Sequence, residues 1–145
     1  MKVLVLNCGS SSIKYKLFEM TTKEVLAQGG IEKIGLPGSF LKLTLPNGEK
    51  KILEKDVPEH TTGVQFIFDT LTNAEYGAVN NLHEIKAVGH RVLHGGTKFS
   101  GSVLIDDAVI AAVEECCDLG PLHNPANLKG IYAVQKLLPE VPQVA

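Results

Sequence analysis

The segment Leu6–Lys14 reads Leu-Asn-Cys-Gly-Ser-Ser-Ser-Ile-Lys, a short polar turn between two apolar stretches. The stretch before the turn, Met1–Leu6, is apolar and β-branched, and the stretch after it, Ile13–Met20, alternates apolar and charged residues. Both patterns predict β-strands, the second with one buried face. Because the turn is tight, the two strands are predicted to pair as a hairpin.

More strands are predicted further along the chain. Glu24–Ile34 is one, and its Gly29-Gly30 pair indicates a bulge or a close approach of another backbone. Phe40–Leu45 alternates strongly, Pro46-Asn47-Gly48 is typical of a turn, and Lys50–Leu53 resumes the alternation, which predicts a second hairpin. The first third of the chain is therefore expected to form antiparallel strands joined by tight turns.

The pattern then changes to helices that alternate with strands. In order, we expect a helix capped by Thr61 or Thr62 and ending at Leu71, a strand over Ile85–Val92, an extended piece over Ser102–Leu104, a helix from Asp106 or Asp107 to Cys117, and a helix capped by Asn124 and begun by Pro125. The apolar faces of the first and last helices are Val64, Ile67, Phe68 and Leu71, and Leu128, Ile131, Val134 and Leu138. This order of elements predicts one α/β domain with a mixed sheet and helices on its faces.

The composition of the chain indicates which partners and which cellular location to expect. The 145 residues include 14 Lys plus Arg and 16 Asp plus Glu, so the net charge is −2 and neither a nucleic-acid nor a membrane partner is expected. No apolar run approaches the ~18 residues of a membrane span, and the strand-like start leaves no room for a signal peptide. Cys8, Cys116 and Cys117 are an odd number and not a disulfide framework, so we expect inert cysteines in a reducing cytoplasm.

The first polar turn has the composition of an anion-binding site. Gly9 permits a positive φ, the hydroxyls of Ser10–Ser12 lie beside backbone N–H groups, and Lys14 can reach the same side as Ser12. Asn7 offers an amide oxygen to Mg²⁺. The alternative is that the turn only connects two strands, which is more common for Gly-Ser sequences. A Walker A loop is excluded, since no Gly-Lys-Ser/Thr follows and no helix begins here.

A second group of donors follows in Val88–Gly96. Arg91 has the planar fork that suits a carboxylate or phosphoryl group, although it could equally belong to a structural ion pair. His90 and His94 are four apart, a spacing that brings two metal ligands together only on a helix, which Gly95-Gly96 disfavours. A third candidate, His123, precedes the helix begun by Pro125, a position where a lone histidine is usually a cap or a packed loop residue.

Three motifs resemble those of the acetate kinases and their short-chain carboxylate kinase relatives. Leu6–Lys14 matches the N-terminal signature of that family position for position. His90–Gly96 resembles the second signature, His-Arg-Val-Val-His-Gly-Gly in many members, with Leu93 in place of the frequent valine. Asp118–Pro125 resembles Asp-Leu-Ala-Pro-Leu-His-Asn-Pro, with Gly120 in place of alanine. The resemblance spans residues 1–145 as the N-terminal lobe of a longer enzyme whose C-terminal lobe is absent from this chain.

The resemblance implies a ribonuclease H-like, actin-like ATPase domain, the fold of sugar kinases, actin and the 70-kDa heat-shock ATPases. It implies an enzyme that reversibly phosphorylates acetate to acetyl phosphate with ATP, which becomes ADP, and with Mg²⁺ or Mn²⁺. The implied roles are Asn7 for the metal, Ser10, Ser12 and Lys14 for phosphate, Arg91 for the carboxylate and the transferring phosphoryl group, His123 for that phosphoryl group, and Leu93 and Leu122 for the substrate's methyl group.

Two other functions stay open at this stage. A propionate kinase is possible because Leu93 is one methylene larger than valine, which can shift discrimination by about 1–3 kcal/mol; butyrate kinases usually carry a different turn. A non-catalytic, actin-like nucleotide-binding module is the alternative from another class, and Arg91, Leu122 and His123 argue against it. Family resemblance also implies a homodimer formed through the missing lobe, and a fragment that is inactive alone.

Overall fold

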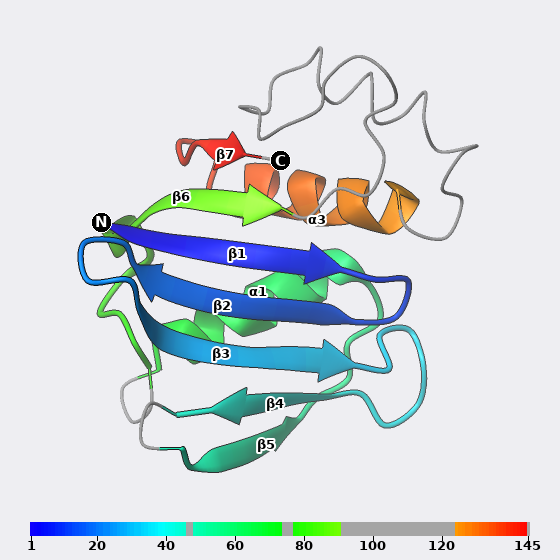
Figure 1. Cartoon of the computed structure of the whole chain (residues 1–145). Helices are drawn as coiled ribbons and strands as arrows, with labels where there is room; N and C mark the ends of the chain where they lie inside the picture. Colours follow the sequence, from blue (N-terminus) through cyan, green and yellow to red (C-terminus); the bar gives the residue numbers. More distant parts are fainter. Residues whose placement is uncertain (46–47, 74–76, 91–123, 145) are drawn as a thin grey trace.

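The computed structural model describes residues 1–45, 48–73, 77–90 and 124–144. Seven strands form one sheet in the order β5-β4-β3-β2-β1-β6-β7 (Figure 1). The strands are β1 (Lys2–Cys8), β2 (Ile13–Glu19), β3 (Glu24–Glu32), β4 (Phe40–Thr44), β5 (Lys50–Glu54), β6 (Ile85–His90) and β7 (Gln143–Val144). The described helices are α1 (His60–Leu71), the short 3₁₀ helix η1 (Leu82–Glu84) and α3 (Asn124–Leu137).

The sheet is mixed, as predicted. Strands β1 to β5 pair antiparallel with their sequence neighbours, whereas β6 lies parallel to β1 and β7 lies parallel to β6. Both predicted hairpins are confirmed. The close approach expected at Gly29 is also confirmed, because a Cβ atom there would lie 2.5 Å from the carbonyl oxygen of Lys42. The register irregularity in the β2–β3 pairing is between Leu17 and Phe18.

The core lies on one face of this sheet, beneath α1 and α3. Cys8 and Ile13 are cross-strand partners on that face. A Cβ atom on Gly63 of α1 would lie 2.9 Å from Ile13 Cδ1, and one on Gly130 of α3 would lie 2.5 Å from Cys8 Sγ. Helices α1 and α3 therefore cover the same face, and no helix in the described ranges covers the opposite face, which we call the open face. Large side chains that are fully buried include Leu4, Leu6, Ile13, Leu17, Ile31, Leu41, Ile67, Phe68, Leu71 and Ile131.

The start of α1 differs from the sequence prediction. The N-cap is Glu59, whose carboxylate accepts hydrogen bonds from the backbone N–H groups of Thr61 at 2.9 Å and Thr62 at 2.7 Å. The hydroxyl of Thr62 donates to the same carboxylate, and these bonds hold the pKa of Glu59 at about 2. The prediction of Thr61 or Thr62 as the cap was wrong because the carboxylate of Glu59 accepts from the amides of Thr61 and Thr62, so the helix begins earlier, at His60. The predicted apolar face is confirmed, with Val64, Ile67, Phe68 and Leu71 buried.

The later elements agree closely where they are described. Strand β6 forms as predicted through His90, and α3 begins at Asn124, one residue before the predicted start at Pro125. The predicted apolar residues Leu128, Ile131, Val134 and Leu138 are buried. The predicted extended piece over Ser102–Leu104 and the predicted helix ending at Cys117 lie outside the described residues. Among the helices in the described ranges, none is long and apolar enough to cross a membrane.

Candidate active site

The turn between β1 and β2 is held by backbone hydrogen bonds. Cys8 pairs with Ile13, so Gly9–Ser12 forms the whole turn. The N–H of Gly9 donates to the carbonyl oxygen of Ser12 at 2.8 Å, and the N–H of Ile34 donates to the carbonyl oxygen of Ser11 at 2.9 Å. The turn is therefore closed on itself and tied to the segment after β3.

Gly9 packs against Ser12 of the same turn. The described glycines with positive φ are Gly35, Gly38 and Gly48, so Gly9 does not use the positive φ that glycine permits. A Cβ atom on Gly9 would instead lie 2.9 Å from Ser12 Oγ. The hydroxyl of Ser12 therefore lies where a side chain at position 9 would begin, so a larger residue at this position requires the Ser12 side chain to move.

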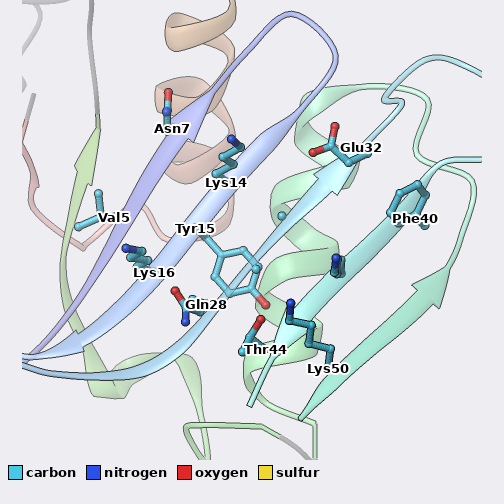
Figure 2. Close-up of a pocket in the computed structure, with 13 residues that line it drawn as sticks. Val5, Asn7, Lys14, Tyr15, Lys16, Gln28, Glu32, Phe40, Thr44 and Lys50 are labelled. Carbon is cyan, nitrogen blue, oxygen red and sulfur yellow. The ribbon is translucent and has the colours of Figure 1, made fainter. Parts of the chain in front are cut away.

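Asn7 and Lys14 lie side by side on the open face, beside the turn. They are cross-strand partners in the β1–β2 register, and their side chains project from the same face (Figure 2). They lie at one end of an open groove of about 700 Å³ that crosses the neighbouring strands. Its lining includes Lys14, Lys16, Lys42, Lys50 and one carboxylate, Glu32. This face is locally cationic although the net charge of the chain is −2.

The structure thus brings together four of the predicted site residues: Asn7, Ser10, Ser12 and Lys14. Such a site can receive an anion through backbone N–H groups, hydroxyls and an ammonium group. Asn7 supplies one amide oxygen, and among the described residues no group of three or more His, Cys, Asp or Glu could hold a metal ion. One oxygen still fits Mg²⁺ bound to a nucleotide, because this ion usually takes one or two protein ligands and completes its shell with phosphates and water.

The other predicted site residues, Arg91, Leu93, Leu122 and His123, lie outside the described residues, as does His94. The described part of β6 shows where the chain lies directly before Arg91. Since β6 is parallel to β1 and His90 pairs with Leu6, β6 ends at the same edge of the sheet as β1. His90, the last described residue of β6, therefore lies at the edge of the sheet where the hairpin turn is located.

His90 itself points away from the open face. Its side chain is 7% exposed, and its Nε2 lies 2.5 Å from Oε1 of Gln143, whose Nε2 donates to the carbonyl oxygen of Ile131 at 3.5 Å. Burial lowers the pKa of His90 to about 4, so the imidazole is neutral near pH 7. His90 therefore connects β6, β7 and α3 inside the core.

We expect the buried His90 to make the free energy of unfolding depend on pH. Between about pH 4 and 6.5 the unfolded chain binds a proton at this residue and the folded chain does not, so stability falls as pH is lowered through that window, by up to about 3 kcal/mol. Urea unfolding at a series of pH values should show a flatter dependence for His90→Gln than for the wild type. His83→Gln, which changes an exposed histidine, should keep the wild-type slope. Identical slopes in all three proteins would contradict this assignment.

Cys8 and His60 both lie next to Gly9 of the turn. Cys8 is buried and its pKa is raised by burial to about 12, so the expectation that it is not a low-pKa nucleophile is confirmed. His60 was not singled out from the sequence, yet its Nε2 lies 2.7 Å from the carbonyl oxygen of Gly9. No local pattern identifies such a contact, because the two residues are 51 positions apart and meet only when α1 packs on the sheet.

Comparison with known proteins gives consistent matches over the whole chain. The model of the acetokinase family matches residues 2–145. The chain is 73% identical over 144 residues to the acetate kinase of Phocaeicola vulgatus, covering 99% of this chain and 36% of that protein. Its structure superposes with a TM-score of 0.97 on acetate kinase from Porphyromonas gingivalis, 66% identical, covering 99% of this chain and 36% of that one. A propionate kinase from Francisella tularensis, 36% identical, gives a TM-score of 0.89, with 99% and 36% of the two chains covered. The chain therefore spans about a third of the length of these relatives.

Proposed function

Because this chain belongs to the acetokinase family, we propose that it forms the N-terminal lobe of an enzyme that transfers a phosphoryl group from ATP to acetate and back. The product in the forward direction is acetyl phosphate. The observation that supports this most directly is the pairing of Asn7 with Lys14 on the open face, immediately beside the Gly9–Ser12 turn. The residues proposed to bind phosphate and the metal thereby share one edge of the sheet.

Phosphoryl transfer relies mainly on positioning and on stabilisation of charge, and the proposed roles follow from that. Ser10, Ser12 and Lys14 hold the ATP phosphates through hydroxyls, backbone N–H groups and one ammonium charge. Asn7 would hold Mg²⁺, or Mn²⁺ in its place, and the ion when bound offsets phosphate charge. The rest of the nucleotide site would come from a C-terminal lobe, so the 145-residue chain alone is proposed to be inactive.

The acceptor side is assigned to the segment after β6. Arg91 would align the carboxylate and stabilise charge on the transferring group, and His123 would donate a hydrogen bond to it. Leu93 and Leu122 would line the pocket for the methyl group. The end of β6 beside β1 supports this assignment, because His90, directly before Arg91 in the sequence, lies at the hairpin edge of the sheet. Arg91 is also the single arginine of the sequence, beside 13 lysines, and only arginine offers a rigid bidentate fork.

Arg91→Ala in the full-length enzyme is expected to lower kcat/KM for acetyl phosphate formation by about 100-fold or more, since a charge-stabilising donor is lost. Arg91→Lys should recover only a small part, because a point charge cannot replace paired donors. The matched control is Lys86→Ala, which removes an exposed cation five residues earlier on β6. A coupled assay with ATP and acetate measures all four proteins. Wild-type rates in Arg91→Ala would contradict the substrate role of Arg91. Absence of turnover in the wild type would instead favour a non-catalytic nucleotide-binding module.

Acetate is proposed as the substrate on the strength of 73% identity to an acetate kinase. Propionate stays the second candidate, because a propionate kinase shares the fold and Leu93 stands where valine is frequent. The ratio of kcat/KM for acetate to that for propionate decides between them, and a ratio below one would reject acetate.

We also propose that the full-length protein is a cytoplasmic homodimer whose subunits contact each other through the C-terminal lobe. Gel filtration with light scattering measures the molar mass and so tests the dimer.

A further inference from the structure

We propose that His60 positions the Gly9–Ser12 turn for phosphate binding, an inference that rests on the proposed function. His60 is the first residue of α1, and its side chain is only 3% exposed. Its Nε2 lies 2.7 Å from the carbonyl oxygen of Gly9. A carbonyl oxygen can only accept, so Nε2 carries the proton and donates it.

The contact belongs to a close fit between α1 and the hairpin. Glu59 caps the helix immediately before His60, and Gly63, one turn later, lies against Ile13 at the first position after the turn. A Cβ atom on Gly63 would be 2.9 Å from Ile13 Cδ1, so the backbone of α1 packs closely against the side chain of Ile13. This packing keeps His60 next to Gly9.

This hydrogen bond fixes the direction of one peptide group. In a trans peptide the C=O and the following N–H point in opposite directions, and the described chain has no cis peptide bond. With the Gly9 carbonyl directed at His60 on the helix side, the N–H of Ser10 is directed away from it. The backbone N–H of Ser10 can then donate a hydrogen bond to a phosphoryl oxygen outside the core.

His60 acts through geometry and not through charge. Burial lowers the pKa of His60, although the bond to Gly9 opposes that shift, so the ring is neutral near pH 7. A neutral donor contributes no net positive charge to bound phosphate. Losing it should therefore weaken nucleotide binding by releasing the turn, while the carboxylate substrate is bound by other groups.

The test compares three variants in the full-length enzyme. His60→Leu removes the donor at similar volume, His60→Gln keeps an N–H donor of similar reach, and His60→Asn keeps polarity but is too short to reach Gly9. Calorimetry of Mg-ATP binding and steady-state kinetics are the measurements, with His83→Leu as a control at an exposed histidine. We expect KM and Kd for ATP to rise about 10-fold in the Leu and Asn variants, the cost of one well-placed hydrogen bond. The KM for acetate should stay within about 2-fold, and Gln should restore most of the ATP affinity.

The possible outcomes separate the two proposals. An inactive wild-type enzyme would reject the proposed function itself. An active wild type with unchanged ATP binding in His60→Leu, or in His60→Asn where the Leu variant does not fold, would overturn the role of His60. Equal losses for ATP and acetate without rescue by Gln would also overturn it, because they would indicate a general loss of structure.

Discussion

Replacing Lys14 by alanine in the full-length enzyme is expected to lower kcat/KM for ATP by about 100-fold or more, the scale on which a charge-stabilising donor contributes to catalysis. Lys16→Ala is the matched control, with an expected loss below about 3-fold. Both lysines are exposed, on β2, and on the open face (Figure 2). They differ in place: Lys14 is opposite Asn7 beside the turn, whereas Lys16 is opposite Val5 and about 7 Å further along the strand.

Comparing Lys14→Ala with Lys16→Ala distinguishes a direct contact with the ATP phosphates from a general electrostatic attraction by the cationic face. The two variants change the net charge equally, so any effect of the overall field is the same in both. Lys14→Arg should retain part of the activity because it keeps the charge. If Lys14→Ala and Lys16→Ala lost activity equally, the proposed phosphate contact would be rejected in favour of a diffuse effect of the cationic face.

The second large effect is expected at the contact between α3 and β1. A Cβ atom on Gly130 would lie 2.5 Å from Sγ of Cys8 and 3.5 Å from its Cβ. Gly130→Ala should therefore lower the free energy of unfolding by about 2–3 kcal/mol, as overpacking of a dense core does. Removing the sulfur with Cys8→Ala takes away the closest atom and leaves an ordinary contact. The double variant should thus be more stable than the sum of the two single changes predicts, by at least about 1 kcal/mol.

Gly89→Ala is the control for this cycle. Gly89 lies on β6 opposite Val5, and a Cβ atom there would have Val5 Cγ2 at an ordinary 3.7 Å. Its substitution should change stability little. Urea unfolding of the five proteins, wild type included, measures the coupling. If the free-energy changes of Gly130→Ala and Cys8→Ala were strictly additive, the clash with Sγ of Cys8 would not be the cause of the destabilisation.

The parts of the fold that could be predicted are the strands and helices with a regular spacing of apolar residues along the sequence. Alternation over Ile13–Glu19 and Phe40–Thr44 identified strands, and the spacing of Val64, Ile67 and Leu71 identified a helix with the correct buried face. These patterns are local, because a side chain's face depends on its own position in the repeat. The order of strands was not predicted, since the pairing of β6 with β1 depends on the whole core.

The site was predicted in part for a similar reason. Asn7 and Lys14 lie in one hairpin, so their juxtaposition follows from a register that the turn sets. His60 was missed because its partner is distant in sequence and a lone histidine before Thr61 carries no signal. The roles of Arg91 and His123 came from the resemblance, and they stay predictions.

The pairing of β6 with β1 has a consequence for how the molecule assembles. Strands β1 to β5 join sequence neighbours, so their contacts close short loops and can form early in folding. The parallel contact of β6 with β1 closes a long loop and costs more chain entropy, which delays it (Figure 1). On this order of events the nascent chain completes its hairpin turn first, and the strand that leads to Arg91 is added to a template already in place.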